Sequence, residues 1–134
     1  MRRNSEILIY NFEREDKISQ RFLRENVEKI LRYLKKQQNS ISLILVPQSE
    51  MKKKNYYWRK KNKATTVLTF SEGDIFLCPK EIKKQALKRK ISQKKFYQLL
   101  LVHSILHLFG YTHDKKKDRE KMENLENKLL AKIQ

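Results

Sequence analysis

The chain has 134 residues, which suits one domain and is short for two domains of ordinary size. Lysine and arginine number 32 and aspartate and glutamate 15, so the formal net charge is +17 at pH 7. The 39% of hydrophobic residues excludes a disordered chain, and no apolar run approaches the roughly 20 residues of a membrane span. The basic N-terminus lacks the apolar core of a secretion signal. We therefore expect a single cytoplasmic domain over residues 1–134, with no membrane partner.

The first half of the chain alternates strand and helix signals. Residues 7–10 and 40–46 are β-prone runs, and Pro47 ends the second. Between them, apolar residues recur every three to five positions, which is typical of a helix: Ile18, Phe22, Val27, Ile30, Leu31 and Leu34. A strand, a helix of about twenty residues and a second strand form a βαβ unit, so we expect the two strands to be parallel neighbours.

The second half begins with a hairpin and continues with helices. Residues 65–70 and 74–78 are strand candidates, and the turn between them ends in Gly73. Pro79 is tolerated at the start of a helix, Ser92 is a typical N-cap of the next helix, and Gly110 ends that helix. One face of this helix carries Phe96, Leu99, Leu100, His103, Leu106 and His107. The last helix has the apolar stripe Met122, Leu125, Leu129 and Ile133.

These elements predict an α/β (α+β) fold in which a four-stranded mixed sheet is packed with helices. The single cysteine, Cys78, excludes an intramolecular disulfide and ends an apolar strand. We expect its thiol to be buried and inert rather than a metal ligand.

Basic residues are concentrated between positions 51 and 95. This segment has 15 basic and 3 acidic residues, and no acid occurs in residues 51–70. Ordinary solvated lysines would give similar counts, but the acid-free stretch favours a polyanionic partner. The aromatic residues of this stretch are suited either to stacking on unpaired bases or to packing in the core: Tyr56, Tyr57 and Trp58. Our candidates for RNA contact are Lys60, Lys61 and Lys63, here called the loop lysines.

All three histidines fall within eleven residues. His103 and His107 are four apart on the predicted helix, so their imidazoles leave the same face. Gly110 lets the chain turn back, so that His113 can supply a third nitrogen. Three imidazoles plus water form the open arrangement of a catalytic zinc site, so we expect one Zn²⁺ per chain, on a late helix and the following turn. The alternative is one or two core histidines hydrogen-bonded to the backbone.

The position after the first histidine argues against a zinc peptidase. The HExxH motif of these enzymes places a glutamate there as the general base, and this chain has Ser104. Zinc lowers the pKa of a bound water to near 7, so hydrolysis remains possible without that glutamate.

The run from His103 to His113, HSILHLFGYTH, resembles the HGxLHLxGYDH signature of the bacterial YbeY family. Residues 59–70 resemble the RGKDxxTDVLSF segment of the family, and residues 73–75 match its GDI strand. The likeness is strong over residues 59–113 and collinear over most of the chain. It implies a metal-dependent, single-strand-specific endoribonuclease of rRNA maturation, which acts in 16S rRNA 3′-end processing and ribosome quality control.

The resemblance also implies residue roles and partners. His103, His107 and His113 correspond to the zinc ligands and Arg59 to a cleft arginine, so Arg59 and His103 are our candidate catalytic residues. The implied partners are single-stranded RNA or rRNA, the ribosomal small subunit and an Era-like GTPase. Two alternatives stay open: a zinc metalloprotease-like hydrolase, and a non-catalytic rRNA-binding assembly factor with a structural metal.

Three positions depart from the family pattern. Ser104 replaces a glycine, and Thr66 and Thr112 each replace an aspartate. The change at Thr112 removes a carboxylate that could orient a ligand imidazole, and Asp74 and Asp114 are candidates to replace it.

Overall fold

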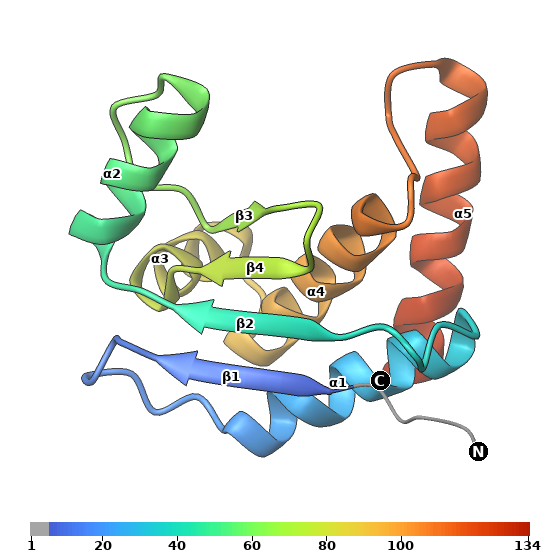
Figure 1. Cartoon of the computed structure of the whole chain (residues 1–134), viewed down its shortest axis with the longest axis horizontal. Helices are drawn as coiled ribbons and strands as arrows, with labels where there is room; N and C mark the ends of the chain where they lie inside the picture. Colours follow the sequence, from blue (N-terminus) through green and yellow to red (C-terminus); the bar gives the residue numbers. More distant parts are fainter. Residues whose placement is uncertain (1–5) are drawn as a thin grey trace.

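The computed structural model describes residues 6–134, so the first five residues of the expected domain lie outside the described part. Figure 1 shows the elements in chain order: β1 (Ile7–Asn11), α1 (Gln20–Tyr33), β2 (Ile41–Leu45), α2 (Gln48–Arg59), β3 (Val67–Thr69), β4 (Asp74–Leu77), α3 (Pro79–Arg89), α4 (Gln93–Leu108) and α5 (Lys116–Ile133). No helix of the described residues is long and apolar enough to cross a bilayer.

The four strands form one mixed sheet in the order β1-β2-β4-β3. Strands β1 and β2 are parallel, with Ile7 opposite Ile41, which confirms the predicted βαβ unit. Strand β2 is also parallel to β4, whereas β3 and β4 form an antiparallel hairpin. The predicted fold class, a single domain with a four-stranded mixed sheet packed with helices, is therefore confirmed.

The hairpin turn depends on Gly73. Its φ angle is +103°, and a Cβ atom at this position would lie 2.8 Å from the carbonyl oxygen of Ser40. Only glycine fits such a backbone without strain. Strand β3 is shorter than the predicted run of residues 65–70, because only residues 67–69 pair with β4.

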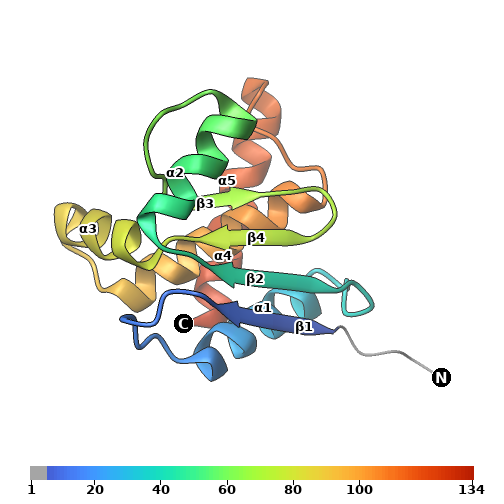
Figure 2. The same ribbon diagram turned by 60° about the vertical axis from the view of Figure 1, so that its left-hand side comes forward.

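Helices α1, α3, α4 and α5 lie on one side of the sheet (Figures 1 and 2). Alternate residues of β2 point into this layer, so Ile41, Leu43 and Leu45 are buried. Helix α5 buries Met122, Leu129 and Ile133 of its predicted stripe, and Leu125 packs against the core from a partly exposed position.

Helix α4 is central, because it contacts α1, α3, α5 and β3. Ser92 caps it as predicted, since its hydroxyl accepts a hydrogen bond from the Lys95 amide at 3.1 Å. The helix face that the sequence analysis singled out is less buried than the other sides of the helix. Its members Phe96 and Leu106 are buried, but Leu99, Leu100 and His103 are partly exposed and His107 is exposed. The fully buried side chains on other sides of the helix are Tyr97, Leu101, Val102, Ser104 and Ile105. A helix that packs against four elements is apolar on nearly all sides, so its apolar pattern does not show which face points to the core.

Helix α2 was not expected from the sequence. Arg59 lies in its last turn. Met51 and Asn55 are the buried residues of this helix, so it shows almost no apolar periodicity. Lys60 ends the helix in a left-handed conformation, and the Asn55 side-chain amide donates a hydrogen bond to the Lys63 carbonyl at 2.8 Å. This bond ties the following loop, residues 60–66, to the helix.

Cys78 lies between β4 and α3 and is fully buried. Burial raises the pKa of its thiol, which keeps the group protonated and unreactive. The prediction of a buried thiol is confirmed, and Pro79 occupies the first turn of α3 as expected.

Candidate metal centre

The structure brings the three histidines together where α4 ends. One nitrogen atom from each of His103, His107 and His113 lies within 4.8 Å of the others. His103 and His107 lie one helical turn apart, and their Nε2 atoms are 3.0 Å from each other. Gly110 has a φ angle of +91°, and the Tyr111 amide donates a hydrogen bond back to the Leu106 carbonyl at 3.1 Å. This turn reverses the chain and returns His113 to the two helical histidines.

The spacing of these nitrogen atoms fits one metal ion. Tetrahedral zinc with Zn–N bonds of about 2.0–2.1 Å separates its nitrogen ligands by about 3.3 Å. The 3.0 Å between the Nε2 atoms of His103 and His107 is close to that value, and the nitrogen atom of His113 lies within 4.8 Å of both. The Nε2 atom of His113 is also buried without a hydrogen-bond partner, which leaves it available to a ligand. The cluster can therefore bind a metal ion.

The charge state of His107 favours metal binding. Burial, followed by the nearby His103 and His113, lowers the pKa of His107, so its imidazole is neutral at pH 7. Only a neutral imidazole offers a lone pair to a metal.

Sequence reasoning missed one residue of this centre, Glu126 on α5. One carboxylate oxygen, Oε1, lies 3.6 Å from His103 Nδ1 and 3.6 Å from His113 Nε2. Burial acts to raise the pKa of Glu126, but the two histidines outweigh it, so the pKa is below its ordinary value and the group is ionised. Within residues 6–134, no other carboxylate lies within 4.0 Å of a histidine nitrogen, so Asp74 and Asp114 do not take this place.

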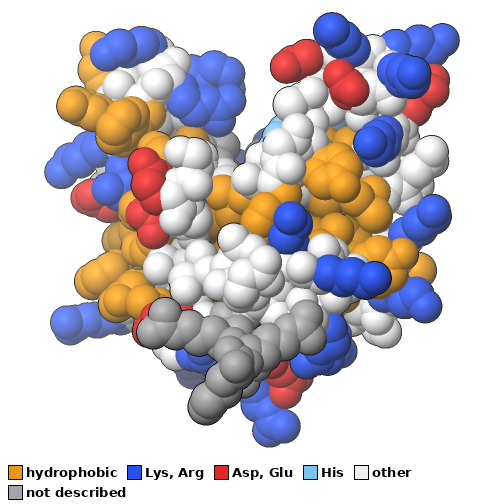
Figure 3. Space-filling view, turned by 45° about the vertical axis from the view of Figure 1, so that its right-hand side comes forward, with side chains coloured by type: hydrophobic (Ala, Val, Ile, Leu, Met, Phe, Trp, Pro, Cys, Tyr) orange, Lys and Arg blue, Asp and Glu red, His pale blue; other side chains and the backbone are white. Residues whose placement is uncertain are grey.

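Two hollows in the surface meet at His103. One, of about 520 Å³, is lined by Arg59, His103 and His107 together with β3 and Ser104. The other, of about 660 Å³, is lined by residues that include Lys63, Lys84, Arg89, Leu99, His103 and Glu126. We call the two hollows together the site groove. Figure 3 shows the molecular surface hollowed between two projecting lobes, with histidine visible at the wall of the cleft.

Only some of the basic residues predicted to contact RNA line the site groove. Helix α2 places Arg59 beside two of the histidines, and Lys63 lines the second hollow. Lys60 and Lys61 are exposed in the loop after α2 and do not line either hollow. The aromatic residues before Arg59 are not core residues, since the exposed fractions of Tyr56, Tyr57 and Trp58 are 57%, 68% and 60%.

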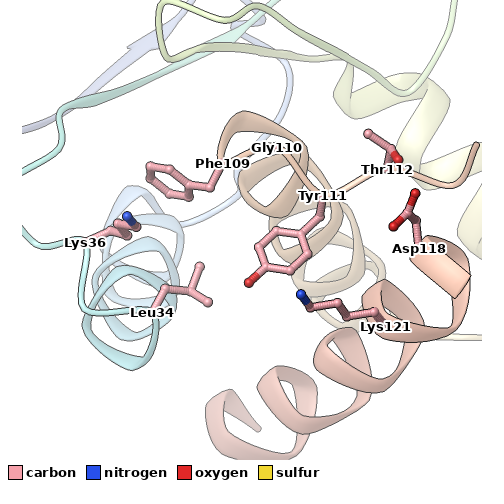
Figure 4. Close-up of a pocket in the computed structure, with 8 residues that line it drawn as sticks. All are labelled: Leu34, Lys36, Phe109, Gly110, Tyr111, Thr112, Asp118 and Lys121. Atoms are coloured by element: carbon pink, nitrogen blue, oxygen red, sulfur yellow. The ribbon is translucent and has the colours of Figure 1, made fainter.

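A third hollow, of about 370 Å³, lies at the turn that follows α4. It is lined by Leu34 and Lys36, which follow α1, by α5 and by the turn, and it contains no histidine (Figure 4). Thr112 lines this hollow together with Asp118 rather than the site groove.

An α/β domain with three convergent imidazoles beside a groove lined by basic residues has the features expected of a metal-dependent hydrolase. A family model described as endoribonuclease YbeY matches residues 8–134, and the chain belongs to this family. The resemblance drawn from the histidine signature is therefore confirmed.

Individual relatives agree with this result. The endoribonuclease YbeY of Buchnera aphidicola subsp. Schizaphis graminum is 36% identical over 115 residues, which cover 78% of this chain and 72% of that protein. The endoribonuclease YbeY of Ruthia magnifica is 29% identical over 138 residues, 95% of each chain. The solution structure of TM1509 from Thermotoga maritima has a TM-score of 0.66 and 24% identity and covers 95% of this chain and 88% of that one. This last likeness supports the fold.

Proposed function

We propose that this chain is a zinc-dependent endoribonuclease that cleaves single-stranded RNA. The observation that carries the proposal is the convergence of His103, His107 and His113 at the junction of two hollows that Arg59 and Lys63 also line. Membership of the endoribonuclease YbeY family gives the class of reaction, hydrolysis of RNA.

In this proposal the three histidines would hold one Zn²⁺ ion through one nitrogen atom each. The bound ion would supply a Lewis acid for a phosphoryl oxygen of the substrate. His103 lines both hollows, so an RNA strand lying along the site groove would pass this residue. The guanidinium of Arg59 binds two phosphate oxygens at once and stabilises negative charge that develops at the reacting group.

Charge and aromatic residues outside the centre support a single-stranded substrate. Lys63, Lys84 and Arg89 line the groove and offer sequence-independent contacts to phosphates. Lys60 and Lys61 are exposed in the loop that leads to Lys63 and add positive charge outside the groove. Tyr57 and Trp58 are exposed close to Arg59, where unpaired bases can stack on them. Bases inside an RNA duplex are already stacked on their neighbours and are not free for such contacts.

The motif resemblance supports the biological role of the same site. We propose that the substrate is rRNA in the cytoplasm, cleaved in 16S rRNA 3′-end processing and ribosome quality control. The ribosomal small subunit and an Era-like GTPase are the proposed partners, and they rest on this resemblance alone.

The proposal is tested with metal-free and zinc-reloaded protein. Each is incubated with one RNA sequence as a single strand and as a duplex, and with an unstructured peptide. We expect zinc-dependent cleavage of the single strand and little cleavage of the duplex. Zinc-dependent cleavage of the peptide alone would instead identify a metalloprotease-like hydrolase. RNA binding without cleavage in the zinc-loaded protein would identify a non-catalytic assembly factor.

A further inference from the structure

Glu126 is held against the metal centre by the packing of α5. This helix buries Met122 and Leu129, and Glu126 lies four residues after the first and three residues before the second. Residues at these spacings share one face of a helix. The core contacts of α5 therefore orient the Glu126 carboxylate towards α4 and the turn after it, where it lines the site groove.

The two nitrogen atoms of His103 face different partners. Its Nε2 atom lies 3.0 Å from His107 Nε2, within the ligand cluster, and its Nδ1 atom lies 3.6 Å from Glu126 Oε1. In metal sites, a ligand histidine usually donates its second N–H to a carboxylate, which fixes the tautomer and the orientation of the ring. The same Glu126 oxygen lies 3.6 Å from His113 Nε2, so one carboxylate reaches both histidines.

Other roles for this carboxylate fit the contacts less well. Glu126 is not part of the group of ligand atoms that lie within 4.8 Å of one another, so it stands outside the metal-binding set. Lys63, Lys84 and Arg89 line the same hollow, but among the described residues the ion-pair partners of Glu126 are the two histidines. Its negative charge is therefore directed at the metal centre.

We propose that Glu126 is a positioning residue: its carboxylate, 3.6 Å from Nδ1 of His103, pairs with that side of the ring and keeps Nε2 directed at the metal. This inference rests on the metal site of the proposed function, but not on RNA cleavage.

Three variants test it: Glu126→Ala, the isosteric Glu126→Gln, and Glu123→Ala as a control. Glu123 is an exposed glutamate one turn earlier on the same helix, so the control removes the same charge without touching the centre. Zinc affinity is measured by competition with a chelator, and circular dichroism of each metal-free variant checks the fold. The visible spectrum of the Co²⁺ form reports the set of ligands.

We expect Glu126→Ala to weaken zinc binding by about 10–100-fold, the usual effect of losing such a partner of a ligand histidine. Glu126→Gln keeps one acceptor oxygen and should recover part of that loss, and Glu123→Ala should bind zinc within twofold of wild type. Equal affinity of Glu126→Ala and wild type, or an equal loss in Glu123→Ala, would overturn the proposal. A Co²⁺ spectrum changed by Glu126→Gln would also overturn it, because Glu126 would then be a ligand. A wild-type protein that binds zinc but does not cleave RNA would contradict the proposed function and leave this inference standing.

Discussion

Replacement of Arg59 by lysine separates charge from geometry in the site groove. Arg59 lines the same hollow as His103 and His107, and it forms no ion pair with a carboxylate among residues 6–134. Its guanidinium is therefore free to bind phosphate. The Arg59→Lys variant keeps the positive charge but loses the planar pair of N–H donors.

The expected magnitude follows from that difference. Loss of one preorganised donor to a developing oxyanion lowers the rate by about 100–1,000-fold, or about 2.7–4 kcal/mol of transition-state stabilisation. Because Arg59 stands at the exposed end of α2, where solvent weakens electrostatic effects, we expect the lower end, about 100-fold. The control is Lys61→Gln, two residues later in the exposed loop, which should mainly weaken binding.

The assay is single-turnover cleavage of single-stranded RNA with enzyme in saturating excess over substrate, so that weaker binding does not contribute. A rate for Arg59→Lys within twofold of wild type would refute the assigned role and make Arg59 one charge among several. A comparable loss in Lys61→Gln would show that the assay reports charge in general.

Three further predictions concern pH, salt and the backbone. Zinc affinity should fall as the pH drops through about 6.5, because an imidazole must be neutral to bind the ion. The lowered pKa of His107 keeps this residue neutral at pH 7. An affinity unchanged between pH 7.5 and 5.5 would contradict a histidine site. The logarithm of RNA affinity should fall linearly with the logarithm of salt concentration. Replacing the loop lysines by glutamine should reduce the slope of that line by up to about 2 if all three contact phosphates. An unchanged slope would mean that these lysines are ordinary solvated side chains. In denaturant titrations, Gly73→Ala should lower the free energy of unfolding by about 3 kcal/mol, because the added Cβ would lie 2.8 Å from a carbonyl oxygen. Gly110→Ala should lower it by only about 1–2 kcal/mol, because the added Cβ would meet nothing within 4 Å. Equal losses would refute the steric argument.

The parts of the fold that the sequence predicts are those coded locally. The strand runs, the glycine of the hairpin and the Ser92 cap each act within a few residues of chain, and all occur in the structure. The histidine cluster belongs to the same group, because a spacing of four residues and a glycine turn are enough to bring three imidazoles together.

The features that sequence reasoning missed depend on contacts distant in the chain. Helix α2 buries Met51 and Asn55, and its aromatic residues at 56–58 are consecutive and exposed, so no apolar period marks the helix. Glu126 reaches the centre only because α5 packs on α4, and nothing in its neighbourhood separates it from the exposed Glu123. The sequence did not show which face of α4 packs against the core, because this helix is buried on nearly all sides.

The most direct test of the account is cleavage of single-stranded RNA by His107→Ala beside wild-type protein, with bound zinc measured in the same samples. His107 is exposed, so its replacement should leave the core intact, and circular dichroism checks this. We expect wild type to carry about one zinc per chain and to cleave the RNA, and the folded variant to lose both properties. A folded His107→Ala protein that cleaves single-stranded RNA at the wild-type rate would contradict the claim that this metal centre carries the reaction.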